Sequence, residues 1–600
     1  MNDLPFHRRA LHEAYAGGLD PSEVIVEAYR RADAVADPGI FLHRVPLEQA
    51  LAEAAALGPF DPNRLPLYGL PFAIKDNIDL EGAPTTAACP AFAYRAERDA
   101  QVVAKLRAAG AIPIGKTNLD QFATGLVGVR TPFPVPRNAL DPAIVPGGSS
   151  SGSAVAVAQG LVSFALGTDT AGSGRVPAAL NNIVGLKPTL GLLSSSGVVP
   201  ACRTLDTVSI FALSAEDAHA ALGAAAGFDP TDAFARPLPP VPWSAPPPSF
   251  RLGVPDARSR EFFGDGLQAA SFAAALDDLR DMGASIDALD FSPFFEVAAM
   301  LYEGAWVAER LTVIEQLLAR QPDAVHPVTR QIIAAAERLS AADAFRGIYR
   351  LAELKRLAEP LLDRVDLLAV PSIPTFYSVA DLEADPIGPN ARLGTYTNFV
   401  NLIDLAGIAV PTRPRGDGRP GSVTLLGRAG SDGRLAALAA ALHQCSGVKL
   451  GATGWPLPEP QLPSPAADPD EITLAVVGAH MAGLPLNPEL TKRGARFLET
   501  TRTASCYRLF ALAGGPPQRP GLVRTANGGA AIALELWAMP KAAFGAFLEK
   551  VPPPLAIGTL TLEDGRLVKG FLAEAAASDQ ALDITASGGW RAYLATSPAA

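Results

Sequence analysis

Gly147-Gly148-Ser149-Ser150-Ser151-Gly152-Ser153 is the stretch that decides how this 600-residue chain is interpreted. A second small-residue stretch, Gly167-Thr168-Asp169-Thr170-Ala171-Gly172-Ser173, places Ser173 24 positions after Ser149, and Lys75 lies 74 positions before Ser149. No histidine occurs between His43 and His219, so these serines have no imidazole nearby in the sequence. The pattern therefore favours a Ser-Ser-Lys arrangement over a Ser-His-Asp one.

A serine hydroxyl becomes a strong nucleophile only when a base accepts its proton. Lysine accepts a proton only in its neutral form, and its ordinary pKa is about 10.4, so burial has to lower that pKa. Lys75 follows the apolar stretch 70–74, where desolvation supplies this shift. A second serine between base and nucleophile is a suitable relay, because a hydroxyl both donates and accepts.

A phosphate-binding loop is the alternative interpretation of the glycine- and serine-rich stretch. A Walker loop requires a lysine and then a serine or threonine after its last glycine, whereas Ser153 and Ala154 follow Gly152 here. The combination of both serines with Lys75 favours catalysis.

Short apolar strands and helices alternate between residues 65 and 210, which predicts an α/β fold. We expect strands at 70–74 and 112–115, a helix at 101–109, and amphipathic helices within 8–36. Further buried strands are predicted at 367–371 and 407–411.

Proline-rich segments divide the chain. Residues 237–248 are interpreted as a surface excursion within the first domain, and residues 455–471 as an extended linker. The predicted domains are therefore 1–454 and 472–600. The second domain is expected to be α+β, with strands at 472–477 and 531–537, a helix at 542–550 and a hairpin turn at 563–566.

Composition excludes several classes of protein. A net charge of -11 argues against a nucleic-acid-binding surface. The four cysteines are too widely spaced to indicate a zinc site or a disulfide framework. The start of the chain lacks a signal-peptide core, and the apolar run 154–167 is too short to cross a bilayer. We expect a soluble cytoplasmic protein that uses no metal or organic cofactor.

Residues 65–215 resemble the amidase signature family, in the stretches 115–118, 146–153, 167–178 and 184–189. The resemblance implies an amidase signature fold, with a central mixed or mostly parallel sheet covered by helices on both faces. It also implies that Ser173 is the nucleophile, that Ser149 is a bridging serine following a cis peptide bond, and that Lys75 is the general base. The oxyanion hole is expected from the backbone N–H groups of Thr170, Ala171, Gly172 and Ser173. Ser151 stands where many family members have glycine.

Other parts of the chain resemble allophanate hydrolases, notably 123–130, 197–203 and the whole of 472–600. Residues 301–310 are similar to the helix with which those enzymes bind the substrate carboxylate, which implies substrate-binding roles for Tyr302, Arg310 and Gly125. Tyr302 and Arg310 are eight positions apart, about two helical turns, so one helix presents both on one face. A guanidinium beside a phenol suits a small carboxylate.

In the second domain, His480 follows a predicted strand and a glycine, while Arg502 and Tyr507 are expected on a strand. In some allophanate hydrolases this domain is credited with assisting decarboxylation of the first product. His480 is therefore a candidate participant, and a domain that serves assembly or stability is the alternative.

The resemblance implies hydrolysis of allophanate, a small anionic ureido compound, to ammonia and carbon dioxide, as in urea degradation. The alternatives are a broad-specificity amidase acting on neutral amides, a component of an amidotransferase and a non-catalytic scaffold. The tail argues against the amidotransferase, and the intact Lys75, Ser149 and Ser173 argue against the scaffold. We expect a homodimer or a higher homo-oligomer.

Overall fold

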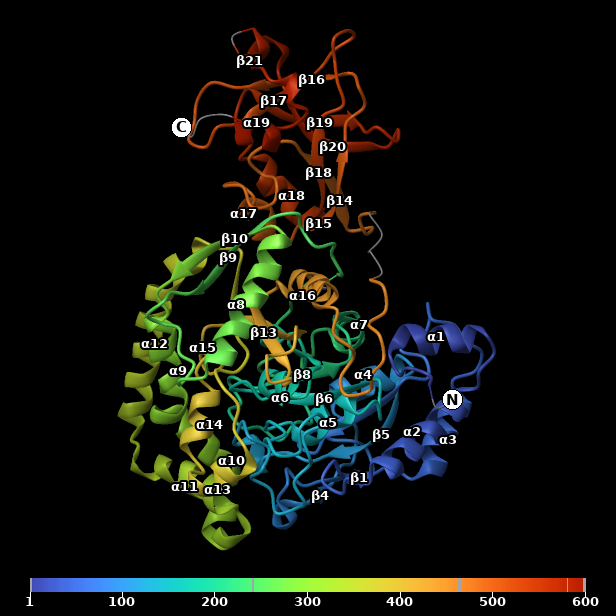
Figure 1. Cartoon of the computed structure of the whole chain (residues 1–600), viewed down its shortest axis with the longest axis vertical. Helices are drawn as coiled ribbons and strands as arrows, with labels where there is room; N and C mark the ends of the chain where they lie inside the picture. The colour runs from blue at the N-terminus through green and yellow to red at the C-terminus, as the bar shows by residue number, and fades with distance from the viewer. Residues whose placement is uncertain (1–2, 240–241, 461–465, 580, 597–600) are drawn as a thin grey trace. The chain divides into compact units, whose positions relative to one another are not determined.

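The computed structural model describes residues 3–239, 242–460, 466–579 and 581–596, which divide into two compact units (Figure 1). The first unit comprises residues 1–241, 252–281 and 286–460, and the second comprises 242–251, 282–285 and 461–600. The segment 242–251, expected within the first domain, thus belongs to the second unit. The exact domain boundaries at residues 454 and 472 stand as predictions from the sequence.

An eleven-stranded sheet forms the centre of the first unit, in the order β1-β5-β2-β6-β8-β7-β12-β13-β11-β9-β10. Its strands are β1 (Phe41–Arg44), β2 (Pro71–Lys75), β5 (Ile112–Thr117), β6 (Phe164–Asp169), β7 (Val184–Lys187), β8 (Thr207–Ala212), β9 (Phe250–Pro255), β10 (Ala284–Leu289), β11 (Leu367–Pro371), β12 (Leu405–Thr412) and β13 (Gly421–Arg428). A small separate ribbon pairs β3 (Pro84–Thr85) with β4 (Tyr94–Arg95).

Both pairing directions occur, which confirms a mixed sheet. Among the described pairings of this sheet, β5–β2–β6 and β9–β11 are parallel, and the others are antiparallel. The reason is visible at β12 and β13, which the loop 413–420 joins directly. A link of that length makes an antiparallel hairpin, since a parallel crossover needs a dozen or more residues.

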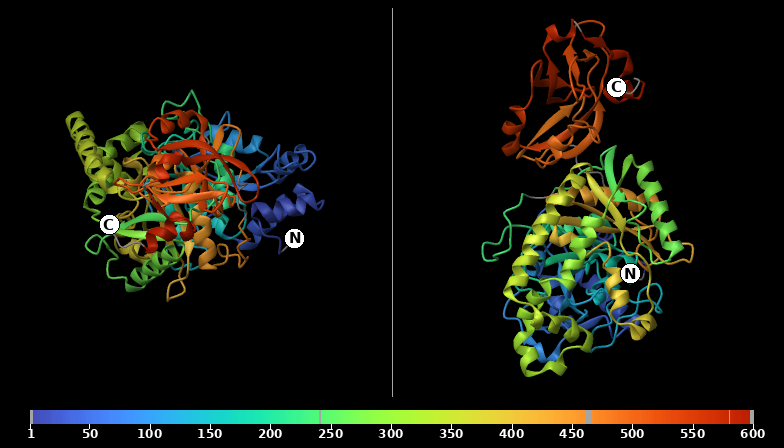
Figure 2. Two further views of the ribbon diagram at one scale, coloured as in Figure 1. Left: turned by 90° about the horizontal axis from the view of Figure 1, so that it is seen from above. Right: turned by 90° about the vertical axis from the view of Figure 1, so that its left-hand side faces the viewer.

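Helices surround this sheet in both views of Figure 2. They are α1 (Arg8–Ala16), α2 (Pro21–Val35), α3 (Leu47–Ala56), α4 (Gln101–Ala108), α5 (Ser151–Ala158), α6 (Arg175–Leu180), α7 (Ala215–Ala225), α8 (Gly266–Asp281), α9 (Ser292–Glu303), α10 (Trp306–Arg320), α11 (Pro327–Ala334), α12 (Ala341–Asp363), α13 (Val379–Ala384), α14 (Gly388–Leu393), α15 (Phe399–Leu402) and α16 (Asp432–Ser446). The predicted elements at 8–36, 70–74, 101–109, 112–115, 367–371 and 407–411 are confirmed.

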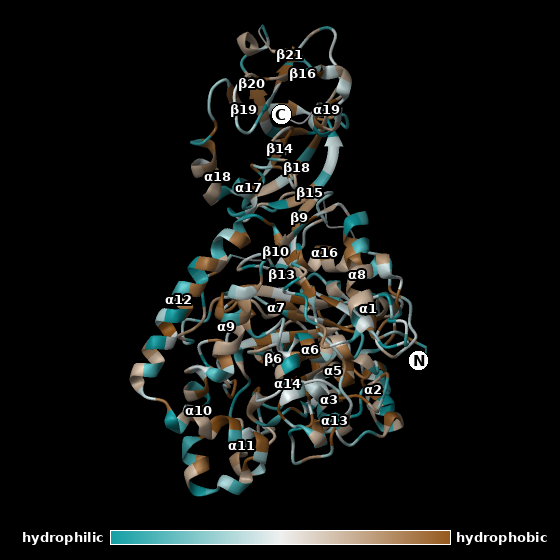
Figure 3. Cartoon of the chain, turned by 60° about the vertical axis from the view of Figure 1, so that its left-hand side comes forward, coloured by the Kyte–Doolittle hydropathy of each residue, from teal (hydrophilic) through white to brown (hydrophobic). Residues whose placement is uncertain are grey.

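Burial explains why these strands form the centre. All residues of β2, β5, β6, β7 and β8 are buried. In Figure 3, where the ribbon is coloured by residue hydropathy, brown segments are frequent around β6. Strands buried on both faces read as continuous apolar runs rather than as alternating ones. No helix in the described ranges combines the length and the apolar character needed to cross a bilayer.

The second unit holds a five-stranded sheet, β15-β18-β14-β20-β19, and a three-stranded sheet, β17-β16-β21. Its elements are β14 (Glu471–Val476), α17 (Pro488–Thr491), β15 (Arg496–Arg502), β16 (Tyr507–Ala511), β17 (Pro520–Arg524), β18 (Ala533–Pro540), α18 (Lys541–Leu548), β19 (Leu555–Thr561), β20 (Leu567–Ala573), β21 (Leu582–Asp583) and α19 (Trp590–Thr596). The predicted strands, helix and hairpin are present. Arg502 and Tyr507 lie on different strands, because the chain turns between β15 and β16.

Candidate active site

Lys75 is the last residue of β2, which lies between the parallel strands β5 and β6. Its side chain is fully buried, and Nζ donates hydrogen bonds of 2.7 Å to both Ser149 Oγ and Thr168 Oγ1. Burial lowers the pKa of Lys75 from 10.5 to about 7, although nearby carboxylates, Asp120 foremost, oppose the shift. A substantial neutral fraction at neutral pH therefore makes Lys75 a competent base.

Ser149 lies in the loop that leads into α5. The Gly148–Ser149 peptide bond is cis, as the family resemblance implies. The carbonyl of Ser149 accepts from the Asp120 N–H at 3.0 Å. The neighbouring Ser150 Oγ donates to the carbonyl of Thr168, the residue that also contacts Lys75. The loop is thereby attached to the end of β6.

Asp169 shapes the turn that carries Ser173. Its two carboxylate oxygens accept from the N–H groups of Gly172 (2.8 Å) and Gly174 (3.1 Å). They also accept from Nε and Nη2 of Arg175, both at 2.9 Å, in a fully buried ion pair. Burial raises the pKa of Asp169, but Arg175 and these donors hold it below its ordinary value. The turn is consequently fixed around an ionised carboxylate.

Ser173 Oγ donates to the carbonyl of Gly125 at 3.3 Å. Within the described residues, no hydrogen bond joins Ser173 to Ser149. The proton relay that the resemblance implies is thus present in its first link, Lys75 to Ser149, and not in its second. Catalytic hydrogen bonds commonly tighten only when substrate is bound.

One of the four N–H groups expected to form the oxyanion hole, that of Gly172, is already hydrogen-bonded within the protein. The N–H of Gly172 is engaged by Asp169, so it is directed away from a substrate oxygen. Within the described part of the chain, the N–H groups of Thr170, Ala171 and Ser173 have no acceptor. Gly172 serves the turn differently: its φ of +125° favours glycine, and a Cβ there would collide with Thr397 Oγ1.

Tyr302 and Arg310 lie close together, but they do not lie on one helix as predicted. They lie on two helices, α9 and α10, separated by a break at Gly304 and Ala305, so the expectation of one continuous helix is wrong. Gly304 is extended there, with φ -109° and ψ -165°, which no α-helix accommodates. The Arg310 guanidinium nevertheless lies 5.1 Å from the centre of the Tyr302 ring.

Arg310 is only 2% exposed, and its Nη1 donates to Thr124 Oγ1 at 3.2 Å. Its Nε and Nη2, together with the Tyr302 hydroxyl, are buried without a partner among the described residues. Buried donors are normally paired, so each exception requires an explanation. A bound carboxylate is the ligand that best satisfies such a group.

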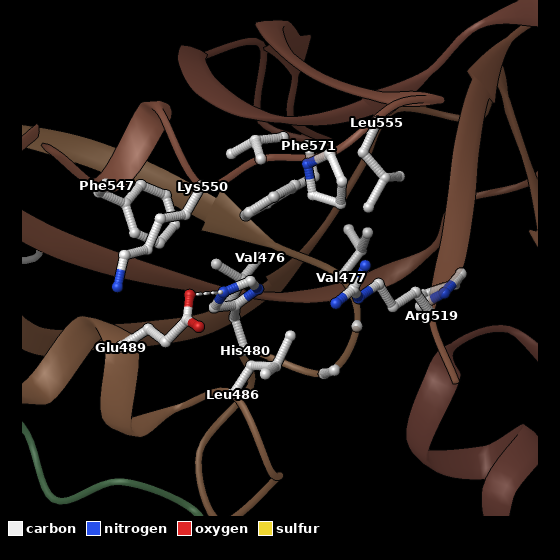
Figure 4. Close-up of a pocket in the computed structure, with 15 residues that line it drawn as sticks. Val476, Val477, His480, Leu486, Glu489, Arg519, Phe547, Lys550, Leu555 and Phe571 are labelled. Carbon is white, nitrogen blue, oxygen red and sulfur yellow. Dashed lines mark hydrogen bonds and ion pairs between the residues drawn. The ribbon is translucent and has the colours of Figure 1, made fainter. Parts of the chain in front are cut away.

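His480 lies in a pocket of the second unit (Figure 4), lined also by Glu489, Arg519, Lys550, Phe547 and Phe571. Its ring stacks on Phe571, with centroids 5.0 Å apart, and its Nε2 lies 3.3 Å from Glu489 Oε2. Burial lowers the pKa of His480, although the contact with Glu489 opposes this. The pocket therefore combines a histidine that favours its neutral form with two cationic side chains.

Two residues of the site were not predicted from the sequence. The Thr168 hydroxyl accepts a hydrogen bond from Lys75, and the Thr124 hydroxyl accepts one from Arg310. Both residues lie within stretches that carried the family resemblance, but a threonine hydroxyl gives no sign in the sequence of what it contacts. No cluster of three metal-ligating His, Cys, Asp or Glu side chains occurs in the ranges that the structure covers.

Two family profiles match the chain. The profile Amidase covers residues 23–436, and the profile Allophanate hydrolase C-terminal domain covers residues 472–595. The solved allophanate hydrolase of Kluyveromyces lactis is 39% identical, with 98% of this chain and 99% of that chain covered at a TM-score of 0.80.

Curated relatives include the urea amidolyase of Saccharomyces cerevisiae, which is 45% identical over 88% of this chain and 30% of its own length. The chain thus spans less than a third of that relative. One component of the glutamyl-tRNA(Gln) amidotransferase of Chloroflexus aggregans is 34% identical over 70% of this chain and 92% of the relative.

Proposed function

The chain belongs to the amidase family, and we propose that it hydrolyses allophanate (urea-1-carboxylate) to ammonia and carbon dioxide. The observation that carries this proposal is the buried Arg310, whose Nε and Nη2 have no partner among the described residues, beside the Tyr302 hydroxyl, which also has none. A site built for a neutral amide gains nothing from burying a guanidinium, because an unpaired buried charge is costly. The similarity to the K. lactis allophanate hydrolase supports the same substrate.

In the proposed mechanism, Ser173 Oγ attacks the terminal ureido carbonyl carbon. Its proton passes through Ser149 to neutral Lys75, and free backbone N–H groups of the 170–173 turn stabilise the oxyanion. The same relay protonates the departing ammonia. Water then hydrolyses the acyl-enzyme, and the N-carboxycarbamate so released breaks down to a second ammonia and two molecules of carbon dioxide. Arg310 and Tyr302 hold the substrate carboxylate throughout.

The other functions fit less well. A broad-specificity amidase acting on neutral amides leaves the buried Arg310 unexplained. The similarity to the amidotransferase component covers 70% of this chain, whereas this chain also matches the profile of the allophanate hydrolase C-terminal domain, at residues 472–595. A non-catalytic scaffold has no use for a lysine whose pKa is lowered to about 7.

Ammonia release from fresh allophanate tests the reaction and the nucleophile together. The purified chain should turn over allophanate faster than malonamide, a neutral amide, and Ser173→Ala should lose both activities by about 10⁴-fold or more, because the acyl-enzyme no longer forms. Turnover of malonamide alone by the unaltered protein would contradict the proposed substrate and identify a general amidase.

The pH dependence of kcat/KM tests Lys75. Protonated Lys75 accepts no proton, so activity should rise with pH through about 7 and level off above it. Malonamide and allophanate should show the same acidic limb, since the base serves both. Lys75→Ala should abolish the activity. A flat profile between about pH 6 and 8 would show that another group is the base.

We further propose that the His480 pocket assists decarboxylation of N-carboxycarbamate; a structural role of the domain is the alternative. Support comes from Arg519 and Lys550, whose positive charges suit a dianion. In His480→Ala, carbon dioxide release should lag behind the first ammonia, whereas in the unaltered protein the two should appear together. Equal lag times in stopped-flow assays of both proteins would favour the structural role.

Assembly and location are also proposals: a homodimer or higher homo-oligomer in the cytoplasm. In support of self-association, α12 exposes Phe345, Ile348, Tyr349 and Leu357, each more than half accessible. Sedimentation equilibrium at micromolar concentration should give at least twice the 62.3 kDa chain mass, and a monomer mass would contradict self-association.

A further inference from the structure

The peptide segment Thr124–Gly125 contacts both ends of the candidate site. The Thr124 hydroxyl accepts from Arg310 Nη1 at 3.2 Å, and the carbonyl of the next residue, Gly125, accepts from Ser173 Oγ at 3.3 Å. Consecutive residues thus touch the cation proposed to bind the carboxylate and the hydroxyl proposed to attack the amide carbon. The separation between these two groups is therefore set by one short piece of backbone.

That backbone is fixed on several sides. The carbonyl of Thr124 accepts from Arg130 Nη1 at 3.0 Å, and Arg130 Nη2 donates to the carbonyl of Pro386 at 2.8 Å. A Cβ on Gly125 would collide with the Asp120 carboxylate, so the segment lies directly against that side chain. Arg130 is itself buried, which makes this support rigid rather than a surface contact.

Thr124 also fixes the direction of Arg310. Its hydroxyl donates to the carbonyl of Phe122 at 3.1 Å, so its lone pairs are turned toward the guanidinium. The bond from Arg310 Nη1 to the Thr124 hydroxyl is the single hydrogen bond that the Arg310 side chain makes within the described residues. It leaves Nε and Nη2 of Arg310 without a partner there. A planar guanidinium held at one corner presents its other donors in a set direction.

We propose that Thr124 is a positioning residue that determines specificity: it aims Arg310 and, with Gly125, limits the enzyme to short amides whose carboxylate lies a fixed distance from the scissile carbonyl. The inference rests on the proposed function, since it concerns the distance between carboxylate and scissile carbonyl that the same site accepts. Malonamate and malonamide form a suitable pair of probes, because they differ only in that a carboxylate replaces one amide group.

The experiment compares kcat and KM for both compounds and for allophanate in four variants of the full chain. Thr124→Val keeps the shape and removes the hydroxyl, Thr124→Ser keeps the hydroxyl, Arg310→Ala removes the cation, and Thr312→Val alters an exposed threonine on α10 as control. Thr124→Val should raise KM about 10-fold or more for the two anions, the size of one charge-assisted hydrogen bond, and much less for malonamide. Thr124→Ser should restore KM to within about twofold.

The outcomes separate the two proposals. Equal losses on anionic and neutral substrates in Thr124→Val, or no recovery in Thr124→Ser, would overturn the positioning role. If Arg310→Ala also loses activity equally on malonamate and on malonamide, the carboxylate site itself is wrong. Calorimetric binding of both compounds to the same variants in a Ser173→Ala background gives the comparison without turnover, so a protein inactive on allophanate still tests Thr124.

Discussion

The buried ion pair between Asp169 and Arg175 is the interaction on which the candidate site depends. Two charges removed from water are tolerated only when further donors satisfy them, and here the N–H groups of Gly172 and Gly174 do so. The same contacts bend the backbone so that Ser173 lies between two of Asp169's donors in the sequence. The proposed nucleophile, Ser173, is therefore placed by an ion pair that takes no part in the proposed reaction.

Much of this was predictable from the sequence, because it follows from short-range pattern. The alternation of strands and helices, the position of Lys75 at the end of a buried strand, and the loops carrying Ser149 and Ser173 all lie in local stretches. Contacts that depend on strand register were not predictable. Thr168 reaches Lys75 only because β6 runs parallel to β2 in a register that pairs Ile74 with Leu166.

The break between α9 and α10 shows a second limit. The helical spacing of Tyr302 and Arg310 predicted one helix, yet the backbone at Gly304 is extended and the residues meet across the break. Helical periodicity reports which faces are apolar, not whether the axis is continuous. Similarly, the segment 242–251 joins the second unit because of its tertiary partners, such as the carbonyl of Phe497 that accepts from Ala245.

The unpaired donors of Arg310 have a thermodynamic consequence for the folded chain. A charged group without a partner in the interior lowers the free energy of unfolding. A ligand that pairs with this group raises the free energy of unfolding again. Any anion that binds only the folded chain stabilises it in proportion to the logarithm of its concentration over its Kd. The resistance of this chain to heat and to proteolysis thus becomes a measure of how much anion surrounds it, independent of turnover.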